Sequence, residues 1–269
     1  MIERFRDLWA HRELLWNMTV KELKVKYKRS VLGFVWSFVT PIIMLAVFSL
    51  VFALLAKGSD LHWFAVYLMC GLLPWLFFVN SLMQSVGSVI TNAALVKKVY
   101  FPREILPIAA VGANIFHFVM QMLVFFIFLL IIQWHFSIYL LLFPLVLLLE
   151  IVFTLGMSLF VSAANVYLRD VQHFVEVATM AWFWLTPIVY TMATLRGVAG
   201  RYTWIYLLNP ITNITLLWQY AIYNPHRYGP SAAYLSLWGI VFTTVGSFLL
   251  LFASYYYFTR SERGFAEQI

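Results

Sequence analysis

Several long stretches of this chain contain no lysine, arginine, aspartate or glutamate, and they constrain its fold more than any other feature. The first three cover residues 34–56, 61–96 and 105–149. A helix that crosses a bilayer needs about 20 consecutive apolar residues, so the first two stretches can each cross once and the third can cross twice. With 63% hydrophobic and 11% charged residues in the whole chain, lipid must cover much of its surface.

The boundaries of these stretches predict an all-α integral membrane protein with six transmembrane helices in a single domain, residues 1–269. The expected spans are residues 34–56, Trp63 to about Ile90, a hairpin of two spans within 105–149 that breaks at 133–137, His173–Leu195, and Tyr228–Thr259. Between the last two spans, residues 196–227 are punctuated by Asn209-Pro210. We expect a re-entrant or interfacial helix pair there, because broken helices at membrane depth require cover from protein or water.

The distribution of basic residues predicts the orientation. Of the 18 Lys and Arg residues, 14 fall on one side of the predicted topology: eight before Gly33, three in 97–104, Arg169, and Arg260 with Arg263. The positive-inside rule therefore places both termini in the cytoplasm. The net charge of +7 is then a topology signal and does not call for nucleic-acid binding.

Two further features of the sequence add little about fold or function. The single Cys70 excludes an intrachain disulfide. No cleavable signal peptide is expected, because about thirty polar and basic residues precede the first apolar run.

The first 33 residues predict an amphipathic helix on the cytoplasmic membrane surface, because apolar and charged residues alternate near helical spacing. Basic residues gather at its end, next to the first span: Lys21, Lys24, Lys26, Lys28 and Arg29. They could contact an anionic lipid headgroup or a pyrophosphate-linked substrate. The alternative is that they only set the topology and bind bulk anionic lipid.

A short cytoplasmic loop combines apolar, aromatic and charged residues, which a passive turn does not need: Lys97, Lys98, Val99, Tyr100, Phe101, Pro102, Arg103 and Glu104. Exposed aromatic side chains at Tyr100 and Phe101 would favour a partner surface. The alternative is an aromatic pair that rests in the lipid headgroup region.

Several motifs occur in an order that resembles one known family. They are Tyr27 to Gly33 with Trp36 and Pro41, Gly71-Leu72-Leu73-Pro74-Trp75, Phe101-Pro102-Arg103-Glu104, Tyr167-Leu168-Arg169-Asp170-Val171, Thr186-Pro187-Ile188-Val189-Tyr190, and Asn209-Pro210. The chain resembles type-2 ABC permeases, and among these the exporters of lipid-linked polysaccharides such as O-antigen, capsule and wall teichoic acid.

The resemblance implies a homodimer with two copies of a separate ATP-binding subunit, in the plasma (inner) membrane. It implies a coupling helix at 94–104 that receives the motion of the ATPase, a gate helix at 1–33, and an extracellular re-entrant region at 196–227. ATP and Mg²⁺ would bind in the partner, so this chain would need no cofactor or metal and would have no catalytic residue. Arg169 and Asp170 would form a local ion pair and a second docking contact, which Glu176 could join.

A glycan passage between the two subunits suits aromatic walls, because flat rings stack on sugars. The candidate lining residues are Trp75, Phe77, Phe78, Trp182, Phe183, Trp184 and Tyr190. Aromatic residues make up 19% of the chain and also collect at membrane interfaces, so packing or an interfacial belt is the competing interpretation.

Glu150 lies in the fourth predicted span, where a bare carboxylate is costly. We expect it to be protonated or paired, with His117 or with a polar group on a neighbouring span. An intramembrane acid would also suit a proton-coupled secondary transporter.

Other functions remain open from the sequence. A type-2 permease for a drug or hydrophobic small molecule is the main alternative. A polyprenyl-phosphate glycosyltransferase is disfavoured, because its chemistry needs clustered carboxylates and the cytoplasmic loops offer only Glu104 and Asp170, in separate places. The chain has no G-x-x-x-x-G-K-[ST] phosphate loop, so ATP hydrolysis is expected in another polypeptide.

Overall fold

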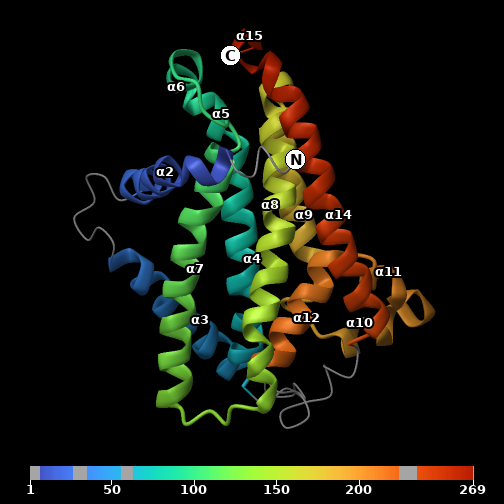
Figure 1. Cartoon of the computed structure of the whole chain (residues 1–269). Coiled ribbons are helices and arrows are strands. Elements are labelled where there is room, and N and C mark those ends of the chain that lie inside the picture. Colours follow the sequence, from blue (N-terminus) through green and yellow to red (C-terminus); the bar gives the residue numbers. More distant parts are fainter. Residues whose placement is uncertain (1–6, 27–34, 56–62, 224–234, 269) are drawn as a thin grey trace.

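The structure is a computed structural model that describes residues 7–26, 35–55, 63–223 and 235–268. Helices account for nearly all of the described chain (Figure 1). Their bounds are α2 Arg12–Lys26, α3 Trp36–Leu55, α4 Phe64–Val86, α5 Ser88–Thr91, α6 Ala93–Lys98, α7 Ile105–Ile131, η2 Ile138–Leu142, α8 Phe143–Tyr167, α9 Val171–Trp184, α10 Met192–Ala199, η3 Gly200–Tyr202, α11 Thr203–Leu207, α12 Pro210–Tyr223, α14 Leu237–Ser261, η5 Glu262–Gly264 and α15 Phe265–Gln268.

Four of the described helical segments are long and apolar enough to cross a membrane: Phe64–Val86, Ile105–Ile131, Ile138–Tyr167 and Leu237–Gly264. The expected break at 133–137 is confirmed. Gln133 adopts a left-handed conformation with φ 54°, and the amide of Trp134 returns to the carbonyl of Leu129 at 2.8 Å. This bond satisfies a carbonyl at the end of α7, as helix C-caps commonly do, and starts the second arm of the hairpin.

The first predicted span corresponds to α3, a 20-residue helix of high apolar content whose described apolar window is Trp36–Val51. Pro41 lies inside this helix. Among its described side chains, α3 contributes only Leu45 to the main core cluster as a fully buried residue. It therefore lies at the periphery of the protomer, against α7 and α4.

The predicted fifth span, a continuous helix over His173–Leu195, is wrong. Helix α9 ends at Trp184, residues 185–191 form turns, and α10 begins at Met192. Pro187 explains the break, because proline has no N–H to donate and its ring clashes with the carbonyl four residues earlier. With 14 residues, α9 is about 21 Å long at 1.5 Å per residue, shorter than the hydrocarbon core of a bilayer.

The region between α9 and α14 consists of short helices, of which α12 is deeply buried. Nearly every residue of α12 after Pro210 is buried, from Ile211 to Gln219 and again from Ala221 to Tyr223. It packs against α4, α8 and α14. Of the described residues 196–223, α12 is thus covered by protein, whereas Val198 of α10 and Trp204 of α11 are exposed. The helical region begins at Met192, earlier than expected, and the re-entrant helix pair over 196–227 stays a prediction.

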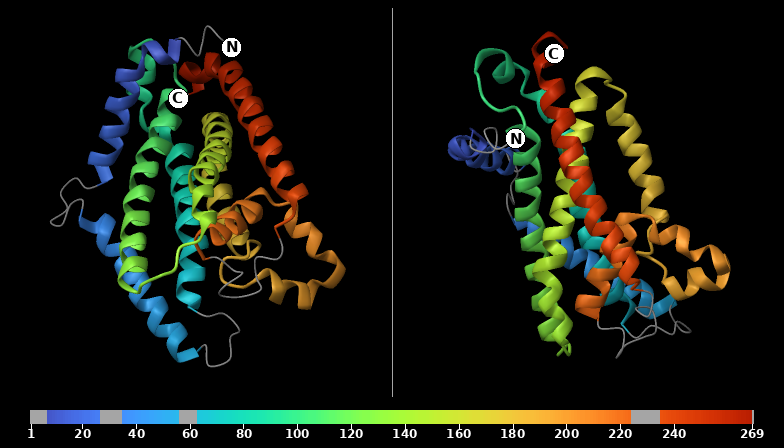
Figure 2. Two further views of the ribbon diagram at one scale, coloured as in Figure 1. Left: turned by 60° about the horizontal axis from the view of Figure 1, so that its bottom comes forward. Right: turned by 45° about the vertical axis from the view of Figure 1, so that its right-hand side comes forward.

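The long helices run lengthwise through the molecule, and the short segments gather at its two ends (Figures 1 and 2). Helices α5, α6 and α15 lie at one end, where α2 also lies crosswise against α7. Helices α10 and α11 lie toward the opposite end. The two ends of the molecule are therefore built from the two groups of segments that the charge distribution assigns to opposite sides of the membrane.

Candidate functional site

The loop between α4 and α7 comprises two short helices and an extended turn. Helix α6 ends at Lys98, and Val99 is extended, with φ −127° and ψ 136°. Of the predicted coupling helix 94–104, only the part up to Lys98 is helical. Lys97 and Lys98 are exposed, and Tyr100 is the most exposed large side chain of the loop at 95%. The loop thus presents two cations and an aromatic ring at the end of the molecule that also carries α2 and α15 (Figure 1).

The prediction that Phe101 is exposed is wrong. Its side chain is only 5% exposed and belongs to a cluster that includes Val96, Phe258 and Phe265. In an extended segment, neighbouring side chains point to opposite sides, so an outward Tyr100 directs Phe101 inward. Burial against the aromatic end of α14 removes apolar surface from water or headgroups, which stabilises the loop in place.

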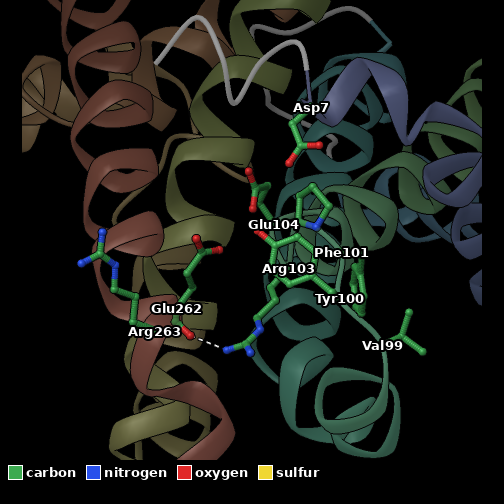
Figure 3. Close-up of a pocket in the computed structure, with 9 residues that line it drawn as sticks. Asp7, Val99, Tyr100, Phe101, Arg103, Glu104, Glu262 and Arg263 are labelled. Carbon is green, nitrogen blue, oxygen red and sulfur yellow. Dashed lines mark hydrogen bonds between the residues drawn. The ribbon is translucent and has the colours of Figure 1, made fainter.

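Polar contacts hold the remainder of the loop against the end of α14 (Figure 3). The guanidinium of Arg103 donates to the backbone carbonyl of Glu262. The hydroxyl of Tyr255 donates to Oε1 of Glu104 at 3.0 Å, and Glu104 is almost fully buried. Between the loop and the chain after α14 lies a hollow of about 410 Å³, lined by Asp7, Val99, Tyr100, Phe101, Pro102, Arg103, Glu104, Glu262 and Arg263.

Arg169 and Asp170 form the exposed turn between α8 and α9. The expected ion pair between them is not formed, and Glu176 instead approaches His173 at 3.9 Å within α9. The turn is held by a residue that we did not single out, Tyr167, whose hydroxyl donates to the carbonyl of Ser261 at 2.7 Å. Both the 94–104 loop and the 168–170 turn therefore contact the same short stretch of chain, at the end of α14.

Within the predicted N-terminal segment the structure forms the helix α2, with Lys24 exposed on its surface. Its amphipathic placement on the membrane surface stays a prediction. Lys26 is the last residue of α2, whereas Lys28 and Arg29 lie outside the described residues. The helix packs closely on α7: a Cβ added at Gly112 would lie 3.3 Å from two side-chain atoms of Thr19. The exposed cation is thus carried by a helix that is fixed to a candidate membrane span.

A polar network also fixes α2, and it includes residues that sequence reasoning missed. The carboxylate of Glu22 accepts from Gln84 Nε2 at 2.8 Å, and Gln84 Oε1 accepts from Asn114 Nδ2 at 2.7 Å. Lys21 Nζ donates to Asn92 Oδ1 at 2.5 Å. Gln84 is a polar residue inside the predicted span from Trp63 to about Ile90, a signal that could have prompted a search for partners such as Glu22 and Asn114. The network joins α2 directly to the start of α6.

A second hollow, of about 210 Å³, opens between α3, α4 and α7. Its lining combines aromatic and apolar groups with the side chains of Ser37, Thr40, Asn80, Asn114, His117 and Gln121. His117 Nδ1 lies 3.2 Å from Ser37 Oγ. Polar groups at this depth in a membrane are costly next to lipid, so they mark a face covered by protein or water.

The seven candidate lining aromatics fall into two groups. Trp75, Phe77 and Phe78 are buried inside the protomer, at 6%, 2% and 0% exposure. Their rings pack on others, with centroids 5.7 Å apart for Trp75 and Phe183 and 5.3 Å apart for Phe77 and Phe118. In this arrangement the three rings serve as core packing.

The other four rings lie at or just after the end of α9. Trp184 is 63% exposed, while Trp182, Phe183 and Tyr190 are half-buried. The indole of Trp182 donates to Asn209 Oδ1 at 3.0 Å, and the hydroxyl of Tyr190 donates to the carbonyl of Trp184 at 2.8 Å. These rings, unlike the first three, retain surface that a ligand could contact.

Glu150 is buried in α8, and its hydrogen-bond partner is Trp218 of α12. The indole N–H donates to Oε2 of Glu150 at 2.8 Å. The expected partner was His117 or a polar group on a neighbouring span; the observed donor is instead on α12, which is too short to be a candidate span, while His117 lies against Ser37. A tryptophan N–H only donates, so this contact links helices without providing a second protonatable group.

Comparison with known proteins agrees with this geometry. Residues 13–223 match the family described as ABC-2 type transporter. The chain belongs to the ABC-2 type transporter family. The matched region begins in α2 and ends with α12, so it includes the 94–104 loop, the seven candidate aromatic residues and Glu150.

Two relatives extend the comparison beyond the family match. The O-antigen export system permease protein RfbA of Myxococcus xanthus is 31% identical over 270 residues, covering 100% of both chains. A protein of the same name from Klebsiella pneumoniae is 31% identical over 240 residues, covering 87% of this chain and 89% of its own. The similarity therefore includes the region after α12.

Proposed function

We propose that this chain is the membrane-spanning permease subunit of an ATP-driven exporter that moves a lipid-linked cell-surface polysaccharide, of the O-antigen, capsule or teichoic acid type, across the plasma membrane. One observation carries the proposal: the identity of 31% to a protein named an O-antigen export permease extends over the full length of both chains. Membership of the ABC-2 type transporter family supports the transport function.

A separate ATP-binding subunit supplies the energy in this proposal. It docks under the 94–104 loop, where Lys97, Lys98 and Tyr100 are exposed, and beside Arg169 and Asp170 of the neighbouring turn. Closure of two such subunits on ATP pushes on these loops, and packed helices transmit the movement as rigid bodies. Mg²⁺ and ATP bind in the partner.

Two copies of this chain enclose the passage. A long glycan cannot fit an occluded pocket, so its route must be continuous and must open between subunits. The exposed ring of Trp184, the half-buried rings near it, and the polar hollow between α3, α4 and α7 support such a lining, because flat rings stack on sugar faces and amide groups bond hydroxyls.

The proposal includes an orientation with both termini in the cytoplasm. The grouping of α2, α6 and α15 at one end and α10 and α11 at the other supports it (Figure 1). Single cysteines at Lys97 and Arg201 test it with a membrane-impermeant maleimide on intact cells. Labelling at position 201 and protection at position 97 are expected, and the reverse pattern would overturn the orientation.

Export itself is tested by reconstitution. The chain and its ATP-binding subunit are placed in vesicles with a lipid-linked O-antigen polysaccharide, and the polysaccharide that reaches the far side is measured with ATP and without ATP. ATP-dependent movement that requires both subunits is expected. Movement of a hydrophobic dye but not of the polysaccharide would replace the proposal with a drug permease.

A further inference from the structure

We propose that residues 261–268, the chain that follows the apolar part of α14, form a third part of the surface on which the ATP-binding subunit docks. The same residues join the two docking loops of this chain into one unit. This inference rests on the proposed function. The two loops are the 94–104 loop before α7 and the 168–170 turn before α9. The family match ends at residue 223, so it assigns no role to this segment.

The segment is attached to the 94–104 loop by polar and apolar contacts. Arg103 donates to the carbonyl of Glu262, and Phe101 is buried in one cluster with Phe258 and Phe265. The rings of Phe258 and Phe265 meet edge to face, with centroids 5.4 Å apart. Phe265 is fully buried, so the segment folds back onto the loop and does not extend away from the protein.

The same segment is attached to the 168–170 turn through Tyr167. The hydroxyl of Tyr167 donates to the carbonyl of Ser261 at 2.7 Å, and its ring lies 6.0 Å from that of Phe265. A Cβ added at Gly264 would lie 2.7 Å from the Tyr167 hydroxyl oxygen, so a side chain there would displace this contact. The close approach at Gly264 shows that the turn and the segment are fitted to each other.

Both attachments use the carbonyl groups at the end of α14. The last carbonyls of a helix have no intrahelical donor and need partners from elsewhere. The carbonyl of Ser261 receives the Tyr167 hydroxyl. That of Glu262 accepts from the backbone N–H of Phe265 and also receives the Arg103 guanidinium, whose charge is favourable at a helix C-terminus. Each loop therefore caps α14, and a push on either loop reaches the same helix.

The segment also contributes to the surface. The hollow of about 410 Å³ lies between the loop residues Val99 to Glu104 and the segment residues Glu262 and Arg263 (Figure 3). Arg263 is exposed, as are Lys97 and Lys98 just before the loop turn. The hollow itself is lined by two cations, Arg103 and Arg263, and by the carboxylates of Asp7, Glu104 and Glu262. The cations that fit acidic side chains of the partner are therefore the three exposed ones on the loop and the segment, Lys97, Lys98 and Arg263.

The contacts of the segment make the loops and their helices transmit motion as one rigid body. Helix α14 packs along α8, which itself carries the 168–170 turn at its end. With the segment in place, the two loops, α8 and α14 move together when the ATP-binding subunit moves. Without its contacts, the loops would respond separately, and ATP hydrolysis would drive less transport.

Charge reversal tests the docking part. Arg263→Glu and the control Arg260→Glu make the same charge change three residues apart, but Arg260 lies outside the hollow and donates to Tyr256 of its own helix. Each variant is co-expressed with the tagged ATP-binding subunit, and the recovered permease is compared with wild type after gel filtration confirms that it is folded. Arg263→Glu is expected to lower recovery at least fivefold, and Arg260→Glu less than twofold.

Equal recovery of the two variants, whether both high or both low, would overturn the docking role. Failure of the wild-type chain to recover the ATP-binding subunit would overturn the proposed function and this inference together. These outcomes are distinguishable, because the first requires an intact wild-type complex.

Removal of one hydroxyl tests the joining of the loops. Tyr167→Phe removes the bond to Ser261 and keeps the ring, and Tyr257→Phe is a matched control on α14 whose ring packs on Phe160. In vesicles, Tyr167→Phe is expected to lower the polysaccharide moved per ATP hydrolysed at least twofold while ATP hydrolysis continues. A ratio equal to that of Tyr257→Phe would contradict the joining role.

Discussion

The indole of Trp218 donates a 2.8 Å hydrogen bond to the carboxyl group of Glu150, and both side chains are almost fully buried. The bond joins α12, the buried helix of the broken region, to α8, one of the candidate membrane spans. A carboxyl group that accepts from an indole needs no exchange of protons to do so. The contact therefore gives Glu150 a role in holding α12 in place.

Substitution of Glu150 separates this structural role from proton transport. Glu150→Gln keeps an acceptor for the indole and is expected to preserve stability and export. Glu150→Leu leaves the buried N–H of Trp218 without its acceptor, which costs about 1–3 kcal/mol, and thermal unfolding should shift to lower temperature. Loss of export in Glu150→Gln at normal expression would restore the proton-coupled interpretation.

The neighbouring aromatic residues Tyr100 and Phe101 should respond differently to alanine. Tyr100 is 95% exposed, so Tyr100→Ala should change the free energy of unfolding by less than about 0.5 kcal/mol yet reduce ATP-driven export. Phe101 is buried, and Phe101→Ala should cost about 3–5 kcal/mol. Thermal unfolding and export assays on both variants decide this. Wild-type export by Tyr100→Ala would remove it from the docking surface.

The sequence predicted the apolar helices well, because uncharged runs bounded by charges have few alternatives in a membrane. It failed where the outcome depends on tertiary contacts. The charge pattern could not show that Phe101 turns inward, since the decisive partner, Phe265, is more than 160 residues away. Burial of Trp75 and Phe78 depends on rings of α9 and α8 and is equally non-local.

The early end of α9 had a local signal that was not used. Pro187 predicts that a helix stops or kinks before it, but the apolar run through Leu195 favoured a single span. The polar network around Gln84 was only partly predictable. A polar residue in a predicted span indicates that it has a polar partner, but the sequence does not identify Glu22 as that partner. The candidate site was therefore predicted by region, and its contacts required the structure.

Attachment of α2 should depend on one of its lysines and not on another. Lys21 donates to Asn92, whereas Lys24, three residues later, is exposed and has no hydrogen-bond partner in the described part of the chain. Lys21→Met removes a charge-assisted hydrogen bond, so amide exchange in residues 12–26 should accelerate about three- to tenfold. Lys24→Met is the matched control and should exchange as wild type. Equal exchange in the two variants would show that the Lys21 contact does not fix the helix.

Two glycines on α14 should respond in opposite directions to the same substitution. A Cβ at Gly239 would lie 2.7 Å from Oδ1 of Asn213, whose amide nitrogen bonds the carbonyl of Leu207 and the hydroxyl of Thr243. The Asn213 side chain must move to make room for the added methyl group, so Gly239→Ala should destabilise the protein by about 1–3 kcal/mol. At Gly246, in the same helix, an added Cβ meets nothing within 4 Å. Gly246→Ala should therefore raise the free energy of unfolding by up to about 1 kcal/mol, because alanine has the better helix propensity.

Thermal unfolding of both variants in the same detergent measures the difference. Shifts of equal sign would mean that Asn213 does not constrain the approach of α12 to α14, because helix propensity alone acts alike at both positions.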